Sequence, residues 1–156
     1  MNYKLTVIIA TLNSQKYLKR TLDVLKKQVF KNFIIYVADG GSKDKTLQLF
    51  KQSNLKYKII SRKDKSAEEA VNKCFKRIKS DYYTILGSDD FYGNKFYLQN
   101  LINNMKNKNI DFVMPGLALI NGNKKVYKPN KYNFNVVTHR PIFPGYGWMA
   151  MRVDMQ

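Results

Sequence analysis

The 156-residue chain is 44% hydrophobic and 13% aromatic, enough for one domain with a buried core, which argues against a disordered protein. No apolar run approaches the roughly 18 residues of a membrane-spanning helix, and residues 1–20 lack the charged-then-apolar order of a signal peptide. These features predict a cytoplasmic protein. The single cysteine, Cys74, excludes an internal disulfide and a cysteine-cluster zinc site, and we expect it as a buried thiol on the apolar face of a helix.

Positive charge dominates the composition, with 28 lysine and arginine residues against 11 acidic residues and a net charge of +17. Nucleic acid, an anionic membrane surface or a polyphosphate substrate could each exploit that charge. The lysines are scattered rather than gathered in one block, and arginine, which specific phosphate and base recognition favours, is scarce. The charge therefore indicates solvated helix faces first, attraction to an anionic membrane second, and nucleic acid last.

The first two predicted strands are short apolar runs. Lys4–Ala10 is rich in β-branched residues without polar alternation, which is typical of a strand covered on both faces, and Phe33–Ala38 has the same character. Between them lies a predicted helix that Asn13 or Ser14 can cap, with a stripe at helical spacing formed by Tyr17, Leu18, Thr21, Leu22 and Leu25. After an Asp-Gly-Gly-Ser turn, a second predicted helix contains Leu47, Leu49 and Phe50.

The next two units repeat this alternation. Tyr57–Ile60 is the third predicted strand, and Ser66 followed by Glu69 forms a capping box at the start of the clearest helix in the chain. The apolar stripe of that helix comprises Ala67, Ala70, Val71, Cys74, Phe75 and Ile78. Tyr82–Leu86 is the fourth predicted strand, and the helix after it carries Phe96, Leu98, Leu101, Ile102 and Met105.

Four consecutive strand–helix units predict an α/β fold, in which helices flank a mostly parallel sheet over residues 1–110. Residues 111–156 change rhythm and predict a small mixed or antiparallel extension within the same single domain. Its expected strands are Asp111–Met114, Leu117–Ile120, Lys124–Lys128 and Trp148–Val153, with a hairpin turn at residues 121–123 and a loop at Thr138–Gly147.

Polar or acidic residues follow three of the first four predicted strands. They are Thr11 and Asn13 after the first, Asp39 after the second, and the pair Asp89-Asp90 after the fourth. Because ligands of open parallel sheets bind beyond the carboxyl ends of the strands, we expect these residues in one pocket. Asp39 either begins a turn, or accepts hydrogen bonds from ring N–H groups of a base such as uracil while the glycines let the backbone approach.

The adjacent carboxylates of Asp89 and Asp90 require compensation, because they repel each other and lose hydration after a buried strand. Mg²⁺ and Mn²⁺ prefer oxygen ligands, often carboxylates together with substrate phosphates. The pair therefore indicates a metal site in which one carboxylate faces the metal and the other faces a ribose or sugar hydroxyl. His139, the only histidine, is either a surface loop residue or, beside Arg140, reaches a diphosphate or the metal.

Three segments, in this order and spacing, resemble the inverting family-2 glycosyltransferases of GT-A fold: Val7–Ser14, Asp39–Ser42 and Gly87–Asp90. Residues 64–66 resemble another recurring segment, and the resemblance covers roughly residues 4–143. It implies a Rossmann-like domain that binds a nucleotide-diphosphate sugar, commonly a UDP-sugar. The sugar would be transferred to a cell-surface glycan or a lipid-linked acceptor.

The resemblance also implies roles for individual residues. Asp39 would read the base, Ser88 would occupy the first position of a DxD-type motif, and Asp89 would contact ribose or sugar. Asp90 would bind the divalent metal, Mn²⁺ or Mg²⁺, and His139 would lie near the phosphates. The implied substrate-binding residues are Thr11, Asn13, Asp39, Gly40, Asp64, Ser88, Asp89 and His139.

The chain departs from the family pattern on the acceptor side. Inverting transfer needs a general base that deprotonates the acceptor hydroxyl, and relatives carry that carboxylate after the histidine-containing loop. Asp154 is the only acidic residue after Asp111, and its spacing differs from the family's. We therefore expect a chain that lacks part of the acceptor side, with the catalytic base unassigned.

Two other functions stay open at this point. A basic nucleic-acid-binding module would bind with a steep salt dependence and would be insensitive to Asp39 and Asp90. A truncated donor-binding domain would bind the nucleotide without transferring sugar. A nucleotidyltransferase would carry a glycine-rich basic loop early in the chain, and none lies between Ala10 and Arg20. The positive charge also predicts peripheral attachment to the inner face of an anionic membrane.

Overall fold

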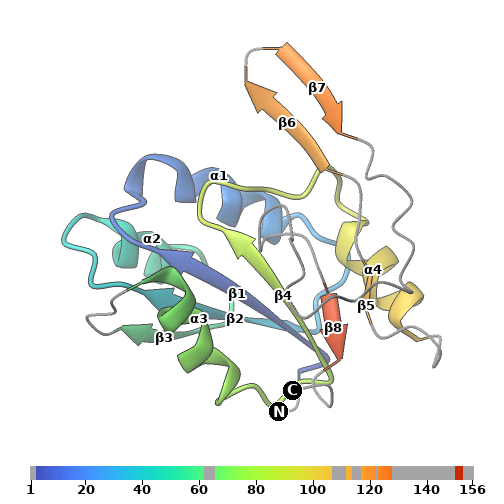
Figure 1. The fold of residues 1–156 in the computed structure, drawn as a ribbon, viewed down its shortest axis with the longest axis horizontal. Helices are drawn as coiled ribbons and strands as arrows, with labels where there is room; N and C mark the ends of the chain where they lie inside the picture. The colour runs from blue at the N-terminus through green and yellow to red at the C-terminus, as the bar shows by residue number, and fades with distance from the viewer. Residues whose placement is uncertain are drawn as a thin grey trace, which may run out of the picture.

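The computed structural model describes residues 3–61 and 66–106, together with the strands at 112–113, 117–121, 123–127 and 150–152. The predicted alternation of strands and helices is confirmed (Figure 1). The elements of this alternation are β1 (Leu5–Thr11), α1 (Gln15–Lys26), β2 (Phe33–Asp39), α2 (Thr46–Gln52), β3 (Tyr57–Ser61), α3 (Ala67–Phe75), β4 (Tyr82–Gly87) and α4 (Tyr97–Met105).

The main sheet has the strand order β3-β2-β1-β4-β8-β5. Strands β1 to β4 are parallel, whereas β8 (Ala150–Arg152) lies between β4 and β5 (Phe112–Val113) and runs antiparallel to both. β6 (Leu117–Asn121) and β7 (Asn123–Tyr127) form the predicted antiparallel hairpin. The fold is therefore the expected mostly parallel α/β sheet with an antiparallel addition.

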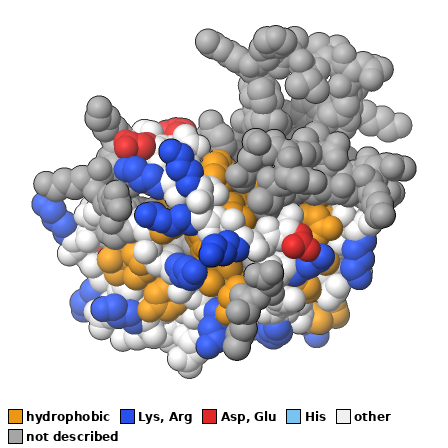
Figure 2. Space-filling model, turned by 90° about the horizontal axis from the view of Figure 1, so that it is seen from below, with side chains coloured by type: hydrophobic (Ala, Val, Ile, Leu, Met, Phe, Trp, Pro, Cys, Tyr) orange, Lys and Arg blue, Asp and Glu red, His pale blue; other side chains and the backbone are white. Residues whose placement is uncertain are grey.

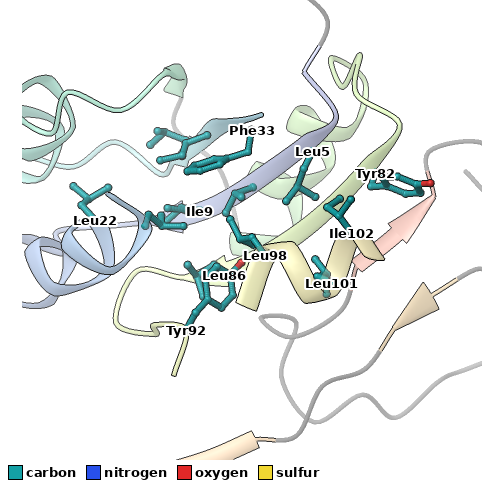
Figure 3. Close-up of a cluster of buried hydrophobic side chains, with 14 of the residues drawn as sticks. Leu5, Ile9, Leu22, Phe33, Tyr82, Leu86, Tyr92, Leu98, Leu101 and Ile102 are labelled. Atoms are coloured by element: carbon teal, nitrogen blue, oxygen red, sulfur yellow. The ribbon is translucent and has the colours of Figure 1, made fainter. Parts of the chain in front are cut away.

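Both faces of the central strands are covered, which explains their lack of polar alternation. On one face, side chains of β1, β2 and β4 pack against α1, α2 and α4. Figure 3 shows Leu5, Ile9 and Leu86 on the side of the sheet that α4 covers. On the other face, Ile8, Tyr36 and Ile85 belong to a second cluster that α3 covers with Ala70, Val71 and Cys74. Helices thus cover both faces of the sheet, and the strand ends present their side chains at its edge.

The N-cap bond of the predicted capping box is confirmed at the start of α3, because the Ser66 hydroxyl accepts a hydrogen bond from the Glu69 N–H at 3.2 Å. Cys74 is a buried thiol, as expected. The prediction that Tyr17 belongs to the buried stripe of α1 is wrong, since its side chain is 52% exposed. Tyr17 lies at the margin of the stripe, where the Lys16 ammonium sits 5.0 Å from the centre of its ring.

Two other expected helix residues lie outside their helices. Phe96 precedes α4 and is 49% exposed, and Ile78 follows the end of α3.

None of the helices in the described ranges has the length and apolar character needed to cross a membrane.

Candidate active site

The carboxyl ends of β2, β1 and β4 lie side by side at one edge of the sheet. Thr11 of β1 pairs with Asp39 of β2, and Ala10 pairs with Gly87 of β4. Because neighbouring strands lie about 4.8 Å apart, the ends of β2 and β4 are separated by roughly 10 Å across β1. The predicted meeting of these acidic strand ends at one edge is confirmed.

Asp39 is fully buried, with 0% of its surface exposed, and its carboxylate organises the turn after β2. The hydroxyls of Thr11, at 3.0 Å, and Ser42 donate to its Oδ1. The backbone N–H groups of Gly41 and Ser42 donate to Oδ2 at 3.0 and 2.9 Å. Burial by itself raises the pKa of Asp39, but these hydrogen bonds, led by those from Ser42, outweigh burial and hold the pKa below its ordinary value.

These contacts have a consequence for base recognition. A carboxylate offers about four acceptor positions, and four donors already occupy those of Asp39. In this arrangement Asp39 plays the turn-forming role that the sequence left open. A base N–H reaches Oδ1 only if the hydroxyl of Thr11 or Ser42 rotates away.

The turn is tied to the loop after β1 through backbone groups. Gly40 N–H donates to the Thr11 carbonyl at 2.9 Å, and Gly41 has φ of +100°, a conformation that glycine adopts without strain. Asn13 has φ of +50°, which asparagine tolerates better than most residues. Its N–H donates to the Ser42 hydroxyl, and its side-chain oxygen accepts from the Lys43 N–H, each at 2.9 Å.

The acidic pair follows β4 in a tight turn. Asp90 N–H donates to the Gly87 carbonyl, and Gly87 N–H donates to Asp90 Oδ2, both at 3.2 Å. A Cβ atom at Gly87 would overlap the Asp90 carboxylate and lie 3.1 Å from Asp89 Oδ1, so a larger residue there would displace the Asp90 side chain. Asp89 is exposed and Asp90 is half-buried. Burial, followed by the charge of Asp89, raises the pKa of Asp90.

The chemistry of this turn fits a hard divalent cation. Within the described residues, neither Asp89 nor Asp90 forms an ion pair, and the carboxylates supply only oxygen ligands. The same residues contain no group of three or more His, Cys, Asp or Glu side chains that could hold a metal. A cation held by Asp90 would therefore take its remaining ligands from substrate phosphates and water, which is how Mg²⁺ is commonly bound.

Helix α1 holds the acidic turn in place. The buried Thr21 hydroxyl lies 2.9 Å from the Ser88 carbonyl and 2.7 Å from the Asp90 carbonyl, to which it donates. The Ser14 hydroxyl, at the N-cap of α1, makes no cap hydrogen bond and instead lies 2.8 Å from the Ser88 hydroxyl. The Arg20 guanidinium sits 3.7 Å from the centre of the Phe91 ring.

Sequence reasoning named four further residues of this edge without giving them a role in the site: Ser14, Thr21, Ser42 and Gly87. A hydroxyl within the otherwise apolar stripe of α1 was the signal for Thr21. The structure brings together Thr11, Asn13, Asp39, Gly40, Ser88, Asp89 and Asp90. Asp64, His139 and Asp154 lie outside the described residues, and the roles expected for all of these residues stay predictions.

Three comparisons place the chain among known proteins. An uncharacterised glycosyltransferase of Rickettsia typhi is 32% identical over 117 residues, which are 74% of this chain and 36% of that protein. The Escherichia coli UDP-Glc:alpha-D-GlcNAc-diphosphoundecaprenol beta-1,3-glucosyltransferase WfgD is 27% identical over 140 residues, 86% of this chain and 54% of that protein. The crystal structure of S. aureus TarS 1-349 in complex with UDP-GlcNAc has a TM-score of 0.65 at 28% identity, covering 71% of this chain and 33% of that one.

The chain thus spans between about a third and just over half of the length of these relatives. The likeness to TarS and the observed sheet confirm the expected GT-A, Rossmann-like fold. The sequence model of glycosyl transferase family 2 matches residues 6–153, almost the whole chain. The chain belongs to glycosyl transferase family 2.

Proposed function

We propose that this chain binds the nucleotide-diphosphate part of a UDP-linked sugar at the carboxyl edge of the sheet, together with Mn²⁺ or Mg²⁺. The whole protein transfers the sugar, with inversion, to a glycan or a lipid-linked acceptor. The observation that carries the proposal is the half-buried Asp90 carboxylate, which has no ion-pair partner among the described residues and lies across β1 from the buried Asp39 turn.

In this proposal the acidic turn after β4 holds the diphosphate end of the donor. Asp90 carries a charge that burial disfavours, so an adjacent cation stabilises its ionised form. When bound, the cation supplies Lewis-acid stabilisation of the charge that develops on the leaving nucleoside diphosphate. Asp89 is exposed beside it and is placed to accept hydrogen bonds from ribose or sugar hydroxyls.

The turn after β2 holds the base. Asp39 Oδ2 is fixed by two backbone N–H groups, whereas Oδ1 is held by two hydroxyls that can rotate. We infer that a ring N–H of uracil replaces one of these hydroxyl donors at Oδ1. Thr11, Asn13 and Gly40 surround this position through their hydrogen bonds to the same turn.

The relatives support this choice of ligands. WfgD is named for a UDP-glucose donor and a GlcNAc-diphosphoundecaprenol acceptor, and TarS was crystallised with UDP-GlcNAc. Asp64 and His139 as substrate-binding residues, residues 1–156 as one domain and a cytoplasmic location belong to the same proposal, which leaves the catalytic base unassigned.

Calorimetric titration with UDP, with and without Mn²⁺, tests the proposal. We expect Asp90→Ala to weaken Mn²⁺-dependent UDP binding at least tenfold. Asp81→Ala is the matched control, because Asp81 is an exposed carboxylate next to the opposite end of the same strand. Equal UDP affinity of wild type and Asp90→Ala, or affinity indifferent to chelation of the metal, would contradict the proposal.

Binding and transfer measurements on the same protein distinguish the two alternative functions that the sequence left open. UDP binding without sugar transfer to any acceptor tested would identify a donor-binding domain that lacks transferase activity. Oligonucleotide binding that falls steeply with salt and is unchanged in Asp90→Ala, without UDP binding, would identify a nucleic-acid-binding module.

A further inference from the structure

A groove of about 640 Å³ lies away from the acidic strand ends, between the end of α3 and the edge strand β3. Tyr36 and Ile60 contribute to its lining. The lining of the groove also includes four exposed basic side chains, here called the groove cations: Lys58, Lys76, Arg77 and Lys79.

The groove follows from the way α3 covers the sheet. α3 packs mainly on β1 and β2, and β3 is the last strand on that side, so α3 leaves part of β3 uncovered. Ile60 faces the α3 side, where it joins Cys74 in the core, and strand alternation places Lys58 on the same face. The uncovered end of the sheet therefore carries a cation above an apolar floor.

The chain after α3 forms the opposite wall. Arg77 N–H donates to the Cys74 carbonyl at 2.9 Å, and the Tyr36 hydroxyl donates to the Arg77 carbonyl at 2.8 Å. These two bonds fix the backbone at the point from which Lys76, Arg77 and Lys79 project. Across the groove, the Lys58 ammonium lies 5.8 Å from the centre of the Tyr36 ring.

The groove concentrates charge of one sign. None of the lining residues is acidic, and none of the groove cations forms an ion pair within the described part of the chain. A concave surface lined by one sign of charge focuses the field and attracts counter-ions. Figure 2, which views the molecule from the side of α3, shows lysine and arginine side chains spread over this face with few acidic ones.

We propose that this groove docks the protein on the phosphate-bearing headgroups of an anionic membrane. Many phosphates presented on one surface match several separated cations. Among the described lining residues, the buried Tyr36 hydroxyl already donates to the Arg77 carbonyl, so it does not specify a single soluble phosphate. The groove cations at 76–79 connect the end of α3 to the start of β4, so they lie toward the edge opposite Asp39 and Asp90. Membrane docking and donor binding therefore do not compete for the same surface.

Sedimentation of the full chain with vesicles tests this assignment, using phosphatidylcholine with or without phosphatidylglycerol at low and high salt. One variant replaces all groove cations with glutamine. The matched control replaces four exposed lysines on or beside α1, α2 and α4. In both variants the net charge of the chain falls from +17 to +13. The control variant is K16Q/K27Q/K51Q/K95Q.

We expect wild type to sediment with anionic vesicles only, and less at high salt, because the attraction is screened. The groove variant should lose at least tenfold in its partition coefficient, and the control about twofold or less. Equal losses in both variants would mean that net charge alone acts, and the assignment would be wrong. UDP titration of both variants checks that they remain folded, independently of vesicle binding.

Two further measurements can overturn the proposal. One is calorimetry with inorganic phosphate, in which micromolar binding without any vesicle binding would identify a soluble-anion site. The other is titration with a single-stranded oligonucleotide. Oligonucleotide binding that the groove variant loses, with vesicle binding unaffected, would assign the groove to nucleic acid.

Discussion

Asp39→Ala should lower the free energy of unfolding by about 2–4 kcal/mol. The substitution leaves the backbone N–H groups of Gly41 and Ser42 without their acceptor, and each lost partner costs about 1–3 kcal/mol when the group is buried. Both residues are partly exposed, so water can reach these groups, which favours the lower part of the summed range. The hydroxyls of Thr11 and Ser42 can turn to other partners and add little.

Asp39→Asn separates the charge from the shape of this carboxylate. The amide oxygen can keep both backbone donors, and the amide N–H₂ can donate to the hydroxyl oxygens of Thr11 and Ser42 after they rotate. Only the charge assistance of the hydrogen bonds is lost, so we expect a smaller loss of about 1–2 kcal/mol. Asp89→Asn, an exposed carboxylate nearby, should change stability by less than about 0.5 kcal/mol and serves as the control.

Urea-induced equilibrium unfolding at about pH 7 measures these differences, and its pH dependence checks the cause. The pKa of Asp39 is lowered in the folded protein, so its ionised form contributes stability above the unfolded value of 3.8. That contribution is lost as the pH falls through the folded-state pKa. The difference in unfolding free energy between wild type and Asp39→Asn should therefore narrow as the pH falls below 3.8. An Asp39→Ala variant within about 0.5 kcal/mol of wild type at neutral pH would refute the reasoning.

Two predictions concern the acidic turn. Thr21→Val removes the hydroxyl that holds the carbonyls of Ser88 and Asp90, so Mn²⁺-dependent UDP binding should weaken about three- to tenfold in calorimetry, while Thr21→Ser keeps the hydroxyl and most of the affinity. Wild-type affinity in Thr21→Val would show that α1 does not position this turn. The pKa of Asp90 is raised, so its ionisation opposes folding once the pH exceeds the unfolded value of 3.8. Without metal, Asp90→Asn should melt at a higher temperature than wild type at about pH 7, lose that advantage below about pH 3.5, and gain nothing from Mn²⁺. A lower melting temperature of Asp90→Asn at neutral pH would contradict this.

Local pattern was sufficient to predict the strand–helix alternation and its boundaries to within a few residues. β1 spans Leu5–Thr11 where the apolar run predicted residues 4–10, because a strand buried on both faces must be apolar along its length. The N-cap of α3 at Ser66 was also predictable from local sequence, because its hydrogen bond joins residues three apart in the chain. The exposure of Tyr17 could not be predicted in this way, because it depends on which side of α1 the sheet lies.

Contacts between distant residues decided the rest. β8 enters the sheet between β4 and β5, and no local signal predicts that pairing, because the partners lie tens of residues apart. The sequence by itself determined that acidic side chains follow parallel strands and must share one sheet edge. Only the tertiary structure decided that Thr11, 28 residues from Asp39, helps to fill its acceptor positions, and that Thr21 holds the turn of Asp90. A hydrogen bond depends on the distance and direction between two groups in space, and folding alone brings groups so far apart in the chain to that geometry.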